Sequence, residues 1–168
     1  MSAVGDVDQD GVMDVVIGAP GALLPGSTST STGWVTIVSG RTGAKISRIP
    51  GENAGDMFGY RVAGLGDNDH DGKFEFAVGA VSYTNPATPT SMLRGKIYVY
   101  ETDVQGSVTL LWSREGERAQ DTFGNAISGV KDADRDTRNE LVVGAPKYDG
   151  LVGSNSGKIY VYDALTGT

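Results

Sequence analysis

Three short stretches of the sequence each place four carboxylates at alternating positions. They are DVDQDGVMD, DNDHDGKFE and DADRDTRNE, which begin at Asp6, Asp67 and Asp132. Each has acidic residues at positions 1, 3, 5 and 9. In a tight loop, side chains at alternating positions converge on one point, where their oxygens suit a hard divalent cation. The chemistry that these residues predict is therefore cation binding in three separate loops.

The predicted ligands of each loop are the side chains at positions 1, 3, 5 and 9 and the main-chain carbonyl at position 7. Glycine at position 6 supplies the sharp turn, and Thr137 replaces it in the third loop, which we therefore expect to bind most weakly. The three predicted sites consist of Asp6, Asp8, Asp10, Val12 and Asp14; of Asp67, Asp69, Asp71, Lys73 and Glu75; and of Asp132, Asp134, Asp136, Arg138 and Glu140.

Calcium is the ion that fits these ligands, with up to three ions per chain. It takes six to eight oxygens, whereas magnesium prefers near-ideal octahedral geometry and keeps several waters. Zinc favours nitrogen or sulfur, and the chain has one histidine, His70, and no cysteine. Asp and Gly also favour plain turns. However, three such loops in phase argue for a cation, because without one the grouped carboxylates would repel each other.

The acidity of the chain is local. The net charge is −7, and twelve of the 21 Asp and Glu residues lie in the three loops, so elsewhere eleven Lys and Arg outnumber nine acids. The basic surface expected of a nucleic-acid binder is absent. No apolar run approaches the roughly 18 residues that cross a membrane. The 168 residues suffice for one ordinary domain.

Each acidic loop leads directly into a short apolar run: VVIG, FAVG or LVVG. Such runs, rich in β-branched residues and bounded by turns, are typical of buried strands. The loops recur at intervals of 61 and 65 residues, and each full unit has the pattern of four short strands. Four-stranded units in series predict an all-β fold, a β-propeller with blades of four antiparallel strands.

We predict a single propeller region over residues 1–168, with repeats over about 1–50, 51–115 and 116–168. Residues 1–5 match the end of RVAGLGD at Arg61–Asp67, so we expect the chain to begin inside a repeat. These residues lack the features of a signal peptide. The third repeat lacks a fourth strand. The predicted strands are Val15–Gly18, Trp34–Val38, Ala44–Ile49, Tyr60–Leu65, Phe76–Val78, Gly95–Tyr100, Val108–Trp112, Asn125–Val130, Leu141–Val143 and Gly157–Tyr162.

Two further motifs accompany the loops. A Phe-Gly pair stands at Phe58-Gly59 and Phe123-Gly124, and Gly-Ala-Pro stands at Gly18–Pro20 and Gly144–Pro146. With the acidic loop, these motifs resemble the FG-GAP repeat, which builds the β-propeller of integrin α subunits and occurs in many bacterial surface proteins. The resemblance implies calcium between the first and second strands of each blade, an extracellular or cell-surface location and, in the integrin case, seven blades.

The sequence departs from the FG-GAP pattern at several points. The first repeat lacks its Phe-Gly, and the second has Val81 where proline is usual. Glu75 and Glu140 stand where the pattern has Asp, and Thr137 stands in place of glycine. We expect the phenylalanines to pack between blades and the glycines beside them to allow close backbone approach.

The function that these features favour is a non-catalytic, calcium-binding module for adhesion or protein–protein interaction. Its protein or glycan ligand would meet the long loops Gly21–Thr32, Ser82–Leu93 and Tyr148–Ser156, which lie on one face. The alternative is a propeller fragment of a secreted hydrolase, because FG-GAP repeats also accompany enzymes. A catalytic triad would then need His70, which lies at an even loop position.

The number of blades bears on assembly. Propellers usually close with four to eight blades, and the sequence encodes about three, so both end blades would expose apolar flanks. The chain would then be a piece of a longer propeller, or two copies would close a six-bladed ring. We expect the homodimer.

Overall fold

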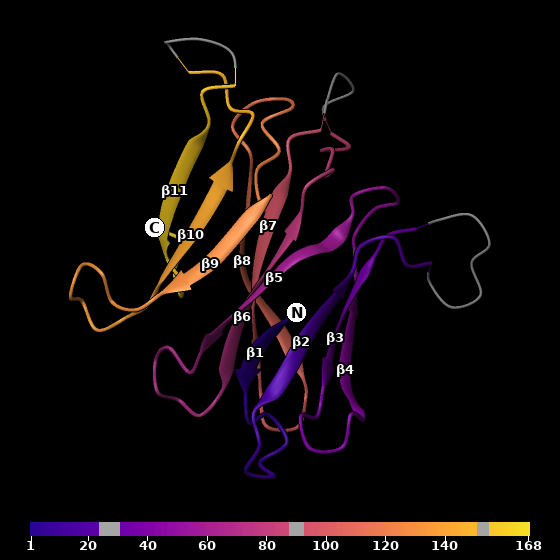
Figure 1. The fold of residues 1–168 in the computed structure, drawn as a ribbon, viewed down its shortest axis with the longest axis vertical. Coiled ribbons are helices and arrows are strands. Elements are labelled where there is room, and N and C mark those ends of the chain that lie inside the picture. The colour runs from indigo at the N-terminus through magenta and orange to yellow at the C-terminus, as the bar shows by residue number, and fades with distance from the viewer. Residues whose placement is uncertain (24–30, 88–92, 151–154) are drawn as a thin grey trace.

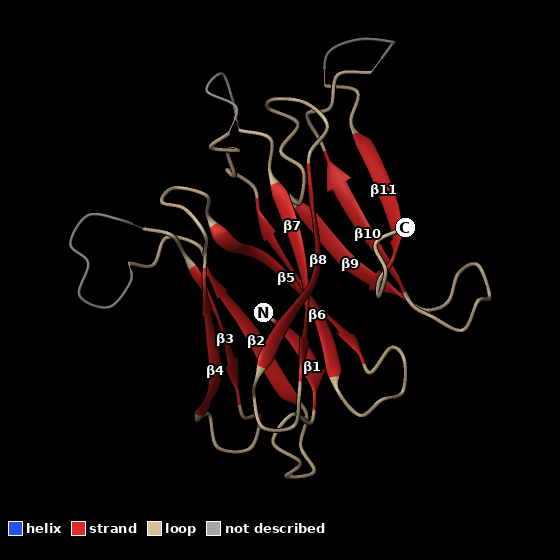
Figure 2. Cartoon of the chain, turned by 180° about the vertical axis from the view of Figure 1, so that it is seen from behind, coloured by secondary structure: helices blue, strands red, loops and turns tan. Residues whose placement is uncertain are grey.

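The structure is a computed structural model that describes residues 1–23, 31–87, 93–150 and 155–168. These residues form three antiparallel sheets and no helix (Figure 2). Accordingly, the described part of the chain has no helix long and apolar enough to cross a membrane. The all-β class predicted from the sequence is confirmed.

Each sheet is a simple meander in which consecutive strands pair. The third sheet has three strands, as predicted, and the other two have four. The first consists of β1 (Ser2–Gly5), β2 (Asp14–Ala19), β3 (Trp34–Val38) and β4 (Lys45–Pro50); the second of β5 (Phe58–Gly66), β6 (Phe74–Ala80), β7 (Lys96–Thr102) and β8 (Val108–Glu115); the third of β9 (Ala126–Val130), β10 (Glu140–Ala145) and β11 (Lys158–Asp163). We refer to these sheets as blades one, two and three.

The blades fan out around β5, the first strand of blade two (Figure 1). β5 contacts β1 on one side and β9 on the other, so the first strands of successive blades are neighbours. A hydrophobic cluster fills each space between blades. One joins Val16 of blade one to Tyr98 of blade two, and the other joins Ile97 of blade two to Leu141 of blade three. Each blade is therefore held by its neighbour.

The phenylalanines of the Phe-Gly pairs pack between blades, as predicted. Phe58 is buried, and the centroid of its ring lies 5.2 Å from that of Tyr98 in an edge-on arrangement. Phe123 is also buried, and its ring meets Tyr160 edge-on at 5.0 Å. Edge-to-face pairs stabilise by about 0.5–1.5 kcal/mol beyond area burial.

The glycines after these phenylalanines are sites of close backbone approach, which also confirms the prediction. A Cβ on Gly18 of β2 would lie 1.9 Å from the carbonyl oxygen of Gly59. A Cβ on Gly79 of β6 would lie 2.7 Å from the corresponding oxygen of Gly124. No side chain fits at these distances, so neighbouring blades meet through bare backbone.

The two end blades each have an uncovered face. Blades two and three share the sequence GKIYVY, but Ile97 and Val99 in blade two are fully buried against blade three. Their counterparts in blade three, Ile159 and Val161, are 72% and 59% exposed. At the other end, Ile17 of blade one is 37% exposed. The predicted apolar flanks are thus present at both ends.

Candidate metal centres

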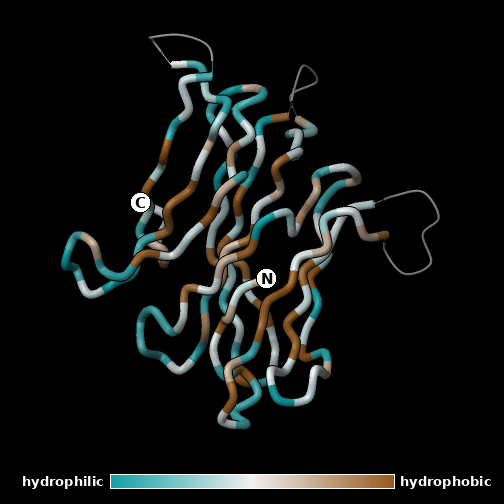
Figure 3. Tube along the Cα trace, viewed as in Figure 1, coloured by the Kyte–Doolittle hydropathy of each residue, from teal (hydrophilic) through white to brown (hydrophobic). Residues whose placement is uncertain are grey.

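The three acidic loops join the first and second strands of their blades. They connect β1 to β2, β5 to β6 and β9 to β10, and we call them loops one, two and three. All three leave the sheets along the lower and left edge of the molecule in Figure 1. Figure 3 shows mostly hydrophilic residues in loops two and three, beside the more hydrophobic strands. The repeated fold therefore brings the predicted sites to one side of the molecule.

All three loops have the same internal hydrogen bonds. The main-chain N–H at position 5 donates to the carboxylate at position 3, over 3.3, 3.2 and 3.1 Å in loops one, two and three. The N–H at position 7, which belongs to Val12, Lys73 or Arg138, donates to the carboxylate at position 5 over 2.8 to 2.9 Å. The residues predicted as main-chain ligands thus lie directly beside the carboxylates.

The backbone turns also agree between the loops. Gly11 and Gly72 at position 6 have φ of 85° and 84°, and Thr137 has 79°. Thr137 therefore takes the left-handed conformation that disfavours side chains. Position 4 is left-handed as well, and His70, which occupies it in loop two, is exposed.

The carboxylates at position 9 are buried, in contrast to those at most other positions. Asp14, Glu75 and Glu140 belong to strands β2, β6 and β10, so these strands begin earlier than predicted. Each accepts the main-chain N–H of position 2, over 2.7, 2.7 and 2.6 Å. Asp14 also accepts the N–H of Gly40 over 2.9 Å. The sequence predicted these residues as ligands; in the structure they also anchor the loops.

The structure brings most, but not all, of the predicted carboxylates together. In each gathered group, one oxygen from every member lies within 4.8 Å of the others. Loop three gathers all four of its carboxylates, and loops one and two gather three each. The groups are Asp6, Asp8 and Asp14; Asp67, Asp69 and Asp71; and Asp132, Asp134, Asp136 and Glu140.

Basic side chains, which the sequence analysis did not consider, contact the loops. Asp10 is the carboxylate of loop one that does not join the other three. Its Oδ2 lies 3.1 Å from Nε of Arg41. Lys73 Nζ lies 2.9 Å from Asp71 and 2.8 Å from Glu101. Hydrogen bonds from Lys73 lower the pKa of Asp71. Arg41 lies in the turn between β3 and β4, whereas Lys73 belongs to loop two itself, so these two ion pairs follow from the fold and not from the repeat pattern.

Loop two contains oxygens that need a partner. Asp67 Oδ1 and Glu75 Oε1 are buried and accept no hydrogen bond within the described residues. Burial raises the pKa of Glu75 to about 7, and the negative charges of Asp69, Asp67 and Glu101 add to this effect. An unsatisfied buried acceptor costs about 1–3 kcal/mol. A divalent cation held by the gathered carboxylates Asp67, Asp69 and Asp71 would give Asp67 Oδ1 a partner, so the residues present fit an oxygen-ligated ion such as Ca²⁺.

Comparison with known proteins agrees with this arrangement. The sequence model of the FG-GAP repeat matches residues 2–36 and 123–162. The chain carries FG-GAP repeats. It is 26% identical over 166 residues to integrin alpha-5 of Xenopus laevis, 32% over 162 residues to integrin alpha-PS2 of Drosophila melanogaster, and 30% over 166 residues to human integrin alpha-IIb.

These alignments cover 98%, 88% and 95% of the chain. The same alignments span only 15%, 11% and 15% of the three integrin chains. Similarity to integrin alpha chains over most of the sequence, together with the three meander sheets, identifies the sheets as β-propeller blades.

Proposed function

We propose that this FG-GAP chain is a non-catalytic, calcium-binding propeller module that serves adhesion or protein–protein interaction outside the cell or at its surface. The observation that carries the proposal is that two buried carboxylate oxygens of loop two, Asp67 Oδ1 and Glu75 Oε1, have no hydrogen-bond partner in the described part of the chain. They belong to a loop whose geometry recurs in all three blades. The similarity to integrin alpha chains supports the adhesive role.

In this proposal the calcium is structural. The proposed ligands are the side-chain carboxylates at positions 1, 3, 5 and 9 of each loop, together with the position-7 carbonyls of Val12, Lys73 and Arg138. All ligands of one ion come from a single local loop, which leaves little room for a substrate. The bound ions would remove the repulsion within each loop and hold its two strands in register.

Calorimetric titration of the chelator-treated chain with CaCl₂, followed by thermal unfolding, tests the proposal. We expect up to three binding events. A site filled at about 100 times its Kd adds about 2.7 kcal/mol, which raises Tm by roughly 5–10 °C in a chain of this size. MgCl₂ at the same concentration is the matched control. The proposal fails if calcium produces neither heat nor a shift in Tm.

The ligand surface in this proposal consists of the long loops between the second and third strands. Residues 24–30, 88–92 and 151–154 of these predicted loops lie outside the described residues. A protein or glycan ligand is therefore inferred from the arrangement of the repeats alone: equivalent loops of successive blades emerge on one face, and variable loops on a rigid scaffold are common binding sites.

We further propose that two copies of the chain pair to close a six-bladed ring. The exposed face of blade three has the same apolar pair, Ile159 and Val161, that blade two buries as Ile97 and Val99. The surface that covers Ile97 and Val99 belongs to blade three, where β10 contributes Leu141 and Val143. Their counterparts on blade one are Val15, which is half-buried, and Ile17, which is 37% exposed. A second copy thus offers the matching surface.

A further inference from the structure

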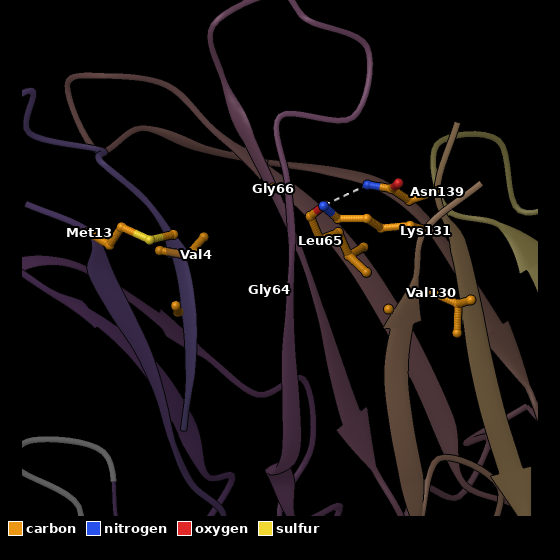
Figure 4. Close-up of a pocket in the computed structure, with 10 residues that line it drawn as sticks. Val4, Met13, Gly64, Leu65, Gly66, Val130, Lys131 and Asn139 are labelled. Carbon is orange, nitrogen blue, oxygen red and sulfur yellow. Dashed lines mark hydrogen bonds between the residues drawn. The ribbon is translucent and has the colours of Figure 1, made fainter. Parts of the chain in front are cut away.

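Loops two and three are joined directly across the boundary between their blades. The main-chain N–H of Asn139, at position 8 of loop three, donates to Oδ1 of Asn68, at position 2 of loop two, over 2.7 Å. The side-chain amide of Asn139 donates to the carbonyl oxygen of Leu65 over 3.0 Å. Figure 4 shows this amide reaching Leu65 above a hollow lined by residues of all three blades.

The side chain of Asn68 makes this contact through its oxygen alone, because its Nδ2 is buried and has no hydrogen-bond partner within the described residues. Asn68 is only 3% exposed, so its amide oxygen has little access to water. Its hydrogen-bond donor is instead the N–H of Asn139. Its own main-chain N–H donates to Glu75 Oε2 over 2.7 Å. Asn68 therefore links the buried carboxylate of loop two to the backbone of loop three. Removing its oxygen would leave a partly buried N–H without an acceptor, which is unfavourable.

The N–H that Asn68 accepts belongs to the peptide unit between Arg138 and Asn139. A peptide unit is planar, and in its trans form the C=O and N–H point in opposite directions. The carbonyl of that unit is Arg138 C=O, the proposed position-7 ligand of loop three. By holding the N–H, Asn68 fixes the direction of the oxygen offered to the ion in the neighbouring loop.

The boundary between blades one and two is built differently. The equivalent residues are Val7, at position 2 of loop one, and Phe74, at position 8 of loop two. Val7 is fully buried in the first hydrophobic cluster, and Phe74 packs against that cluster. The side chain of Val7 has no hydrogen-bonding group, so loops one and two lack this polar link; the hydrogen bond that Gly64 N–H donates to Ser2 Oγ over 3.0 Å joins the strands of the two blades and not their loops. Loop one thus provides an internal comparison for loops two and three.

We propose that the sites in loops two and three bind Ca²⁺ cooperatively, coupled through Asn68 as a positioning residue; this inference rests on the calcium sites proposed above. An ion in loop two orders Glu75 and Asn68, and Asn68 then holds the Arg138 peptide for loop three. The entropy lost in ordering these residues is then already paid when the second ion binds. Binding at either site therefore favours binding at the other by the same factor.

The test is a double-mutant cycle read by NMR during calcium titration of the intact chain. The amide resonances of Gly11, Gly72 and Thr137, one per loop at position 6, report the three sites separately. Site two is disabled by Asp69→Asn with Asp71→Asn. In the parent chain we expect this change to raise Kd at loop three by about fivefold or more, and the same change in an Asn68→Leu chain to raise it less than about twofold.

Controls separate coupling from general damage. His70→Asn changes an exposed residue of loop two that has the same left-handed backbone and should preserve the coupling. Asn68→Ala provides a second variant if leucine prevents folding, and the amide resonance of Asn139 should move in either variant because its acceptor is lost. Loop one, which lacks the polar link, should keep its Kd when Asn68 is replaced.

The outcomes distinguish this inference from the proposed function. If the chain binds calcium but disabling site two leaves loop three unchanged, the coupling is refuted and the calcium sites stand. The same holds if the coupling persists without the Asn68 oxygen. If no loop responds to calcium, both the coupling and the proposed function are refuted.

Discussion

At the scale of single residues, the position-9 carboxylates have two roles that sequence alone did not separate. Asp14 is fully buried and accepts main-chain N–H groups from Val7, Asp8 and Gly40. A ligand role requires a free oxygen, whereas these bonds keep the loop folded in the absence of an ion. Replacing Asp14 therefore affects both calcium affinity and the stability of the calcium-free chain.

We expect Asp14→Ala to weaken calcium binding at loop one and to lower the free energy of unfolding in chelator by about 3 kcal/mol, because several partly buried N–H groups lose a charged acceptor. Gln9→Asn is the control, since Gln9 has φ of 56° and asparagine tolerates this conformation. Urea denaturation and calorimetric titration provide the two measurements. Equal effects of the two substitutions would contradict the proposed loop geometry.

A second residue-scale prediction concerns the protonation of Glu75. Its pKa is raised to about 7, first by burial. The pKa in the folded chain lies above the ordinary carboxyl value, so the folded state binds the proton more tightly than the unfolded state. The free energy of unfolding of the calcium-free chain therefore falls as pH rises from about 4.5 to 7 and levels off above 7, a contribution of about 3 kcal/mol.

Urea denaturation in chelator between pH 5 and 8 measures this dependence. Glu75→Gln removes the titrating group, and we expect it to flatten the profile across that window. Saturating calcium should also reduce the pH-dependent loss, because the ion stabilises the charged carboxylate. A parent chain whose profile matches that of Glu75→Gln would show that Glu75 has no raised pKa.

At the scale of elements, the turn at position 6 distinguishes loop three from the other loops. Thr137 has φ of 79° in a position where Gly11 and Gly72 have nearly the same value. A side chain in the left-handed region costs about 1–2 kcal/mol. We expect Thr137→Gly to raise Tm and to lower the Kd of loop three for calcium, because the strain is removed while the four gathered carboxylates stay in place.

The matched control is the reverse change, Gly72→Thr in loop two. A Cβ on Gly72 would meet no atom within 4 Å, so only its φ of 84° would oppose the new side chain. Tm should therefore rise for Thr137→Gly and fall for Gly72→Thr, by a few degrees each. If Thr137→Gly lowers both Tm and calcium affinity, the turn at Thr137 is not the weak point of loop three.

Most of the strands could be predicted from the sequence. The alternating and β-branched runs predicted all ten of the strands that the described residues form after residue 5, with bounds within a few residues. β6 was predicted as Phe76–Val78 but spans Phe74–Ala80. The difference arises because Glu75 is predicted as the position-9 ligand that ends the acidic loop. In the structure Glu75 is buried in β6 and accepts the N–H of Asn68, a bond within the loop that residue types do not reveal.

The candidate sites, like the strands, could be predicted from the sequence only in part. Their spacing predicted the shared turn at position 6 and the grouping of most carboxylates. The ion pair between Arg41 and Asp10 and the bond between Asn139 and Asn68 were missed, because they join residues 31 and 71 positions apart. Aligning the repeats could have indicated the second contact: positions 2 and 8 of successive loops are Val7 with Phe74, then Asn68 with Asn139.

At the scale of the whole molecule, the same alignment describes the two ends of the blade series. Met13 is the position-8 residue of loop one and is 61% exposed. Ala133 is the position-2 residue of loop three and is also exposed. Each lacks the partner that its counterparts find in the neighbouring blade. Together with Ile159 and Val161, these residues define two end surfaces that a neighbouring blade would complete.

The last prediction is that these surfaces meet between two copies of the chain. A head-to-tail contact closes into a ring when the rotation permits it, and two sets of three blades give six, within the usual range for propellers. Analytical ultracentrifugation in calcium should therefore give the mass of two chains at micromolar concentration. Chelator should favour the single chain, because loops one and three lie at the blades that form the contact.

Ile159→Asp tests the surface itself. This residue is 72% exposed in the single chain, so the substitution should leave its Tm nearly unchanged while placing a charge in the proposed contact, where burial opposes it. We expect the mass to fall to that of one chain. Leu110→Asp is the control, because Leu110 is 46% exposed on β8, an outer strand of blade two away from either end surface. A single-chain mass for the parent, or a two-chain mass that survives Ile159→Asp, would rule the ring out.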